Sequence, residues 1–132
     1  MVKTIQSVCA ESRRQVNVAL PFSPAIRAAD FVFVSGQVGF GEDMRIVAGG
    51  IEAEIRQALE NIANILALDG SVLEDLVKCT VWLDDARDFP ALNKNFAECF
   101  PGGRPARSTV ESRPMIDAKI EIDAIAYGPI AS

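Results

Sequence analysis

Two charged residues occupy predicted strands in the C-terminal part of the chain. Arg107 lies in the segment PARSTV and Glu121 lies in KIEIDAIA, and both segments have the composition and alternation of strands. Glu121 stands between Ile120 and Ile122, so strand geometry points it away from the core that these isoleucines face. If the two strands lie near each other, we expect Arg107 and Glu121 to approach on a common surface.

Arg107 and Glu121 allow two interpretations. A solvated ion pair is the ordinary role of an arginine and a glutamate on the outer face of a sheet. The alternative is a binding site in which the guanidinium receives an anion, because guanidinium and carboxylate groups match geometrically. The chain has no histidine, which excludes Ser-His-Asp and Cys-His nucleophiles and leaves carboxylates, arginines, hydroxyls and backbone groups for any chemistry.

The cysteines and glycines do not form a known cofactor motif. Cys9, Cys79 and Cys99 are widely spaced, form no CxxC pair and have no histidine to complete a zinc site. We expect Cys79 to be a small buried residue rather than a catalytic thiol. The glycine-rich segment 39–50 matches neither GxGxxG nor GxxxxGK[ST]. A disulfide scaffold, a structural zinc site and a nucleotide site therefore have little support.

Size and charge limit the class of protein. The 132 residues and 49% hydrophobic content fit one packed domain spanning residues 1–132. The net charge of −5 disfavours nucleic acid as a partner, because phosphate backbones are bound by concentrated basic surfaces. No apolar run approaches the roughly 20 residues that cross a membrane, and the N-terminal segment lacks the apolar block of a secretory signal. We expect a soluble, cytoplasmic protein.

Periodicity predicts five strands and two helices. The predicted strands cover residues 16–20, 31–38, 76–85, 106–112 and 118–127, and the predicted helices cover 51–68 and 89–100. Segment 21–30 is rich in turn residues and is expected to be a loop. In the third strand we expect the core face to carry Val77, Cys79, Val81 and Leu83. Two helices packed against one sheet, an α+β arrangement, bury both amphipathic faces.

The outer face of the predicted sheet is unusually apolar. It is expected to carry Phe31 and Phe33 or their alternates, together with Trp82 and Ile125. A solvent-facing sheet normally exposes less apolar surface than this. A second subunit covering the face would bury it, and Trp82 is expected at such a contact.

Three segments, VSGQV, ALNKNFAECF and above all RPARSTVES with KIEIDAIA, resemble the Rid family of reactive-imine deaminases. The resemblance implies a chorismate-mutase-like α+β fold with a mixed sheet, assembled as a homotrimer around a central barrel with three sites between subunits. It also implies hydrolysis of 2-iminopropanoate, 2-iminobutanoate or similar imino acids to 2-oxo acids and ammonia. No metal or organic cofactor is implied.

The resemblance also implies roles for individual residues. Arg107 is expected to anchor the substrate carboxylate, and Glu121 to activate water and shuttle a proton. Asn93, Ser35 and Gly36 match positions beside the family's site, although Asn93 could equally be an ordinary exposed helix residue and Gly36 a turn glycine.

Three further positions bear on the substrate. Thr109 stands where backbone groups border the ligand. Phe22 stands where well-known deaminases have tyrosine, so stacking on the ligand is kept and one hydrogen bond is lost. Arg104 could change the entry to the pocket.

Three alternative functions remain open beside the one that the resemblance implies. The protein could deaminate a larger imine or enamine acid from a catabolic pathway, such as an aminomuconate or aminoacrylate. It could instead be a non-catalytic or chaperone-like trimer that binds 2-oxo acids through Arg107. Ribonuclease activity is the least attractive alternative, because the chain is acidic and lacks histidine.

Overall fold

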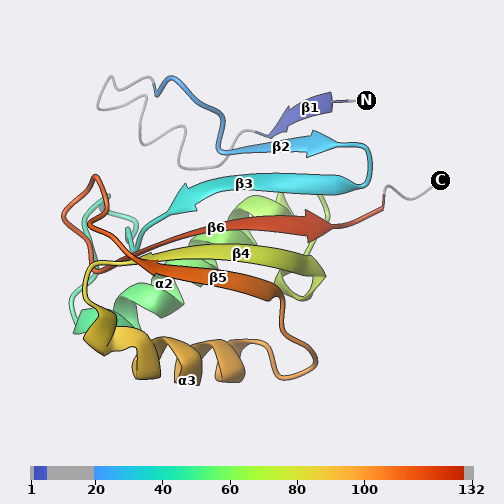
Figure 1. Ribbon diagram of the computed structural model, residues 1–132. Helices are drawn as coiled ribbons and strands as arrows, with labels where there is room; N and C mark the ends of the chain where they lie inside the picture. The colour runs from blue at the N-terminus through green and yellow to red at the C-terminus, as the bar shows by residue number, and fades with distance from the viewer. Residues whose placement is uncertain (1, 6–19, 130–132) are drawn as a thin grey trace.

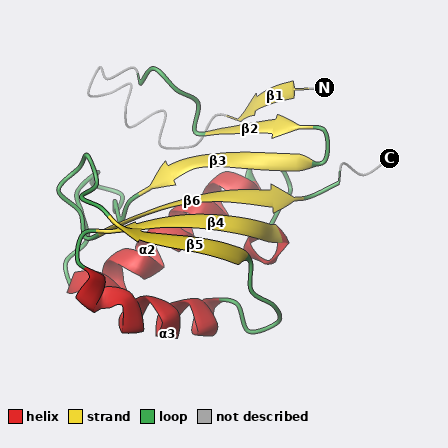
Figure 2. Ribbon diagram, viewed as in Figure 1, coloured by secondary structure: helices red, strands yellow, loops and turns green. Residues whose placement is uncertain are grey.

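A computed structural model describes residues 2–5 and 20–129 of the chain. They form a six-stranded mixed sheet with two α-helices on one face, which confirms the predicted α+β architecture (Figures 1 and 2). The strands are β1 (Val2–Ile5), β2 (Ala25–Ala28), β3 (Phe31–Gln37), β4 (Leu76–Leu83), β5 (Ala106–Glu111) and β6 (Ile120–Tyr127). The helices are α2 (Gly50–Ala67) and α3 (Phe89–Cys99), with short 3₁₀ turns η1 (Leu73–Asp75) and η2 (Ala86–Asp88).

The strand order in the sheet is β1-β2-β3-β6-β4-β5. Every neighbouring pair is antiparallel except β4 and β5, which run parallel. A parallel pair needs a crossover connection, and α3 supplies it. The last strand, β6, thus lies in the interior of the sheet, and β5 forms one edge.

The hydrophobic core lies between the helices and the sheet. Helix α2 buries Ile55, Leu59, Ile62 and Leu66, whose spacing places them on one helix face. They pack with the buried alternate residues of the strands and with Leu92 and Phe96 of α3. Burial of each such side chain contributes about 1.5–3 kcal/mol to folding, which holds the two helices on this face of the sheet.

The structure departs from the predicted elements at two places. Segment Ala25–Ala28 is strand β2, paired antiparallel with β3, although a loop was predicted there. Val2–Ile5 also forms a strand, at the outer edge beside β2. The strand predicted at 16–20 lies outside the described residues except for its last position, which is in no strand.

Strand β4 contains an irregularity that changes which residues face the core. The register with β6 shifts between Leu76 and Lys78, so Leu76 is buried and Val77 is 43% exposed. The prediction that Val77 faces the core is therefore wrong, while Cys79, Val81 and Leu83 are buried as expected. A β-bulge of this kind reverses the alternation of side chains locally.

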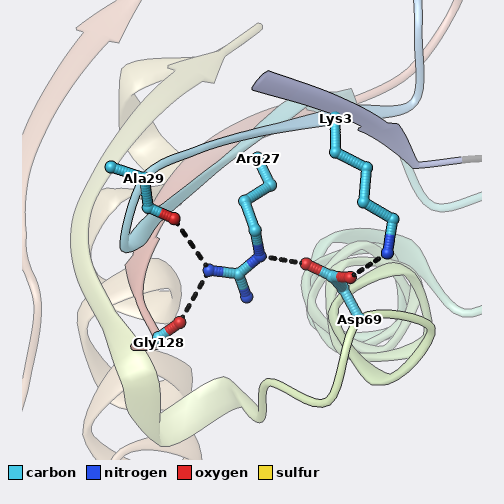
Figure 3. Close-up of polar contacts among 5 residues, drawn as sticks. All are labelled: Lys3, Arg27, Ala29, Asp69 and Gly128. Carbon is cyan, nitrogen blue, oxygen red and sulfur yellow. Dashed lines mark hydrogen bonds and ion pairs between the residues drawn. The ribbon is translucent and has the colours of Figure 1, made fainter. Parts of the chain in front are cut away.

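A buried arginine joins four parts of the fold (Figure 3). The Nη1 group of Arg27 in β2 donates to the carbonyl oxygens of Ala29 at 3.2 Å and Gly128 at 2.7 Å. Its Nε group donates to the carboxylate of Asp69, just beyond α2, which also accepts from Lys3 Nζ at 2.9 Å. Burial alone raises the pKa of Asp69, but the hydrogen bonds from Lys3 and Arg27 outweigh it and lower the pKa below its ordinary value.

No helix among the described residues is long and apolar enough to cross a membrane.

Candidate functional site

Arg107 lies on the helix-covered face of the sheet, at the edge strand β5. It pairs in parallel register with Cys79, a residue of the buried core, and the two side chains therefore share one face. Its guanidinium carbon lies 4.9 Å from the centroid of the Phe96 ring and 5.7 Å from that of Phe89. Its Nη2 group donates to the Asn93 side-chain oxygen at 2.5 Å. Aromatic rings and one amide thus hold the guanidinium in place.

Helix α3 presents all three contacts because their spacing suits one helix face. Phe89, Asn93 and Phe96 are four and then three residues apart. Phe96 is only 4% exposed and packs in the core, whereas Phe89 in the first turn is 42% exposed. Arg107 therefore has one buried aromatic wall and one wall that is open to solvent.

The charge of Arg107 has no carboxylate partner among the described residues, since none of their ion pairs includes it. Burial lowers the pKa of Arg107, and the nearby Cys79 raises it slightly. An arginine remains charged at neutral pH even so. A half-buried cation without an anionic partner is costly unless an anion neutralises it, so this position suits a carboxylate ligand.

Thr109 follows Arg107 on the same face of β5. It pairs with the buried Val81 and is itself half-buried. Thr109 therefore shares with Arg107 the face that the helices cover.

Glu121 lies on the opposite, open face of the sheet. Its neighbour in register on β4 is Trp82, and its carboxyl group packs against Gly36 of β3. A methyl group added to Gly36 would lie 2.9 Å from both the Glu121 carboxyl carbon and its Oε2 atom. Burial, and then the field of Asp123, raises the pKa of Glu121. A raised pKa makes the carboxylate form a stronger base, which suits a group that accepts protons.

Ser35 connects Gly36 to the segment that carries Phe22. Its hydroxyl donates to the Ser23 carbonyl at 2.6 Å, and its backbone N–H donates to the Pro24 carbonyl at 2.9 Å. Phe22 itself is 56% exposed. Ser35 thus holds residues 22–24 beside β3, close to the strand end where Gly36 meets Glu121.

The expectation that Arg107 and Glu121 approach on one surface of the chain is wrong. They point to opposite faces, and β4 lies between their strands. Trp82 of β4 pairs in register with Glu121 of β6 and with Val110 of β5. Val110 lies three residues beyond Arg107. With strands about 4.8 Å apart and a rise of about 3.3 Å per residue, the two Cα atoms are roughly 14 Å apart. Alternation within one strand shows which of its residues share a face, but it does not show which face of the sheet that is. The pairing of β5 with β4 places Arg107 on the face that the helices cover.

The open face of the sheet is apolar, as predicted. Phe31, Phe33 and Tyr127 are 39%, 44% and 46% exposed. Their rings form one group, with centroids 5.3 Å apart for Phe31 and Tyr127 and 6.5 Å apart for Phe31 and Phe33. Ile125 and Trp82 extend this surface and are half-buried. Contiguous apolar surface of this kind is typical of a protein interface.

Phe89 and Phe96 are the residues around Arg107 that the sequence analysis missed. Their positions four residues before and three residues after Asn93 were the available signal. Asn93 was the only residue of this helix face predicted near the site, and Arg107 was predicted on the open face.

The described residues contain no group of three or more histidine, cysteine, aspartate or glutamate side chains placed to hold a metal ion. Cys79 is buried as expected, and burial, with a smaller effect of Asp123, raises its pKa to about 12. Its thiol is therefore protonated at neutral pH and is a poor nucleophile.

The family model described as Endoribonuclease L-PSP matches residues 12–128. A mouse protein named 2-iminobutanoate/2-iminopropanoate deaminase is 36% identical over 83% of this chain and 83% of its own length. The chain belongs to this family, the Rid family. A RutC family protein of Pyrococcus horikoshii is 46% identical over 81% of this chain and 86% of that protein.

Other members of the Rid family agree with this assignment. A protein of Acinetobacter baylyi named 3-aminoacrylate deaminase RutC is 39% identical over 81% of this chain and 86% of its own. The crystal structure of yeast Mmf1 superposes with a TM-score of 0.83 and 29% identity, covering 97% of this chain and 99% of that one. The fold and the family are thus shown by sequence and structure together.

Proposed function

We propose that this protein is a homotrimeric deaminase that hydrolyses 2-imino and enamine acids, such as 2-iminopropanoate and 2-iminobutanoate, to 2-oxo acids and ammonia. The observation that carries the proposal is Arg107, a half-buried cation that has aromatic and amide contacts but no carboxylate partner among the described residues. The names of the mouse and Acinetobacter relatives support the same class of reaction.

Arg107 anchors the substrate in this proposal. Two of its N–H groups bind the two oxygens of the substrate carboxylate, with a fixed geometry that lysine lacks. Asn93 keeps the guanidinium oriented, and Phe89 and Phe96 flank it. Backbone groups of Thr109 border the bound ligand. Asn93 thus acts on the ligand through Arg107.

Glu121 transfers protons between water and the substrate nitrogen in this proposal. Its carboxylate takes a proton from water as the water oxygen bonds to the imine carbon, and the π electrons of the C=N bond move to nitrogen. Glu121 then delivers this proton to that nitrogen, which gives a carbinolamine. As the carbinol oxygen loses its remaining proton and the C=O bond of the 2-oxo acid forms, this second proton passes to the amino nitrogen, the C–N bond breaks and ammonia leaves. The raised pKa of Glu121 makes its carboxylate a stronger base for the first of these transfers.

The separation of these groups supports the proposed assembly of several copies. Arg107 and Glu121 lie on opposite faces of one chain, so a pocket that contains both needs Arg107 from one copy and Glu121 from another. The open apolar face, with Phe31, Phe33 and Tyr127, supports an interface there. In that pocket Ser35 and Gly36 accompany Glu121, and the exposed ring of Phe22 stacks on the ligand.

A second candidate is an enamine acid as the physiological substrate. The relative named 3-aminoacrylate deaminase favours it, and Phe22 offers an apolar ring without a hydroxyl where a different substrate would be contacted. The cytoplasmic location expected from the sequence stays a prediction.

The test couples an amino-acid oxidase to the purified protein and traps the nascent imine with semicarbazide. Across a panel of amino acids, the wild type should reduce the semicarbazone signal, and Arg107→Ala should abolish this effect. Arg45→Ala removes another exposed arginine, one whose side chain makes no ion pair among the described residues, and should leave the rate unchanged. If the wild type is inert on every imine while 2-oxo acids bind it and not Arg107→Ala, the protein is a binding trimer and the deaminase proposal fails.

A further inference from the structure

The backbone conformation at Gly36 does not require a glycine. It lies within strand β3, and its φ angle is not among the positive values recorded for Gly49, Gly50, Gly70 and Gly103. Any residue can adopt that backbone conformation, so a turn does not explain the glycine.

The space beside Gly36 is filled by one side chain. The three atoms nearest to an added Cβ are all in Glu121, at 2.9 Å for the carboxyl carbon, 2.9 Å for Oε2 and 3.2 Å for Cγ. The end of the Glu121 side chain therefore lies directly over the Cα atom of Gly36. Apart from the chain neighbours of Gly36, no other residue in the described part of the chain provides closer atoms.

We propose that Gly36 is a positioning residue for Glu121: its missing side chain leaves the space in which the Glu121 carboxyl group lies against β3. This inference rests on the proposed function only in that Glu121 acts on substrate. The placement of the carboxyl group has consequences that can be measured without turnover.

A comparison with other glycines separates this role from a structural one. At Gly39 an added Cβ would meet the backbone of Glu54, 2.9 Å from its Cα atom, and the fold itself would have to shift. At Gly36 the atoms that must move belong to the end of a flexible side chain. At Gly102 nothing lies within 4 Å.

These three positions give a matched set of alanine variants. Gly36→Ala should unfold at nearly the wild-type temperature and lose roughly 10- to 100-fold in kcat, because a displaced catalytic group costs about this much. Gly39→Ala should lower the unfolding temperature clearly, and Gly102→Ala should change neither quantity. A Gly36→Ala variant that is as active as the wild type overturns the proposal.

A double variant tests whether Gly36 acts through Glu121. Glu121→Ala removes the Cγ atom and the carboxyl group that an alanine at position 36 would touch. Gly36→Ala combined with Glu121→Ala should therefore be no slower than Glu121→Ala alone. If the two losses multiply, Gly36 acts independently of Glu121 and the inference is wrong.

A titration tests the same point without substrate. With the glutamate carboxyl carbons labelled, NMR follows Glu121 in the wild type and in Gly36→Ala. Trp82, the partner of Glu121 in register on β4, and Gly36, against which its carboxyl group packs, carry no charge, and Asp123 on its own strand is the charged group in its field. Displacement from β3 exposes the carboxyl group, and its pKa should fall toward the ordinary glutamate value.

An unchanged titration would overturn the inference about Gly36. If the wild type instead consumes no imine while the titration moves as expected, the proposed function fails and the positioning role stands.

Discussion

Two arginines on the helix-covered face of the sheet have opposite surroundings. Arg27, near one edge, is 5% exposed and is bonded to the Asp69 carboxylate and two carbonyl oxygens. Arg107, at the other edge, is half-buried and contacts two aromatic rings and one amide. The charge of Arg27 is neutralised by Asp69, and that of Arg107 meets no carboxylate in residues 2–5 and 20–129.

The difference separates a structural arginine from one that is available to a ligand. A buried charge that is fully paired stabilises the arrangement of the elements it joins, and removing one partner leaves the other unpaired. A desolvated guanidinium without a carboxylate can bind an anion from outside the chain, with the geometry already prepared. Three predictions test this contrast, in order of decreasing effect.

Arg27→Met should lower the free energy of unfolding by about 3–5 kcal/mol, because the Asp69 carboxylate, whose side chain is 9% exposed, loses its buried partner. Urea denaturation measures this change. The matched control is Arg56→Met, which breaks a pair with Glu98 whose side chains are 53% and 46% exposed. The control should cost less than about 1 kcal/mol. Equal losses in the two variants would show that Arg27 is not structurally special.

Arg107→Met should weaken binding of 2-oxobutanoate by roughly 10- to 100-fold, since hydrogen bonds to charged groups contribute about 1.5–3 kcal/mol. The free energy of unfolding should change by less than about 1 kcal/mol, because no described carboxylate is left unpaired. Calorimetric titration and urea denaturation give the two values. A loss of stability as large as that of Arg27→Met would assign Arg107 to the fold instead.

Asp69 and Glu121 should make stability depend on pH in opposite ways. The folded pKa of Asp69 is lowered, so its contribution is present above its unfolded pKa of about 3.9 and is lost as pH falls toward the folded value. Asp69→Asn should therefore flatten the acid side of the stability curve.

The folded pKa of Glu121 is raised, so the stabilisation from its protonated form is present below about pH 4.3 and is lost as pH rises through the folded pKa. Glu121→Gln should raise stability at neutral pH. Unfolding temperatures between pH 3 and pH 8, measured for both variants, check the two signs. Parallel changes in the two variants would contradict the environments described for these carboxyl groups.

The helices and most strands could be predicted from sequence because their periodicity is a direct consequence of burial on one face. Helix α2 was predicted within a residue at each end for this reason. Strand β2 was missed because its four residues are too few to show alternation, and Pro24 beside them favours a turn. Its strand structure comes from pairing with β3, which is a tertiary interaction.

The candidate site was predictable in its residues and not in its geometry. The motifs around Arg107 and Glu121 indicated the family, and both residues lie in the expected strands. Their separation to opposite faces depends on β5 pairing in parallel with β4, and a single strand carries no information about its partner. Phe89 and Phe96 become neighbours of Arg107 only once α3 crosses beneath β5.

The interior position of β6 has a consequence for how the chain folds. Strand β6 separates β3 from β4, so the sheet consists of two unjoined parts until residue 127 is available. Most of the pairing in the sheet's centre connects distant segments, which slows folding because long loops must close first. On the ribosome, neither part can complete its core before β6 emerges, and the apolar surface of α2 stays exposed during this interval. The family's most recognisable segment is thus also the one that completes folding.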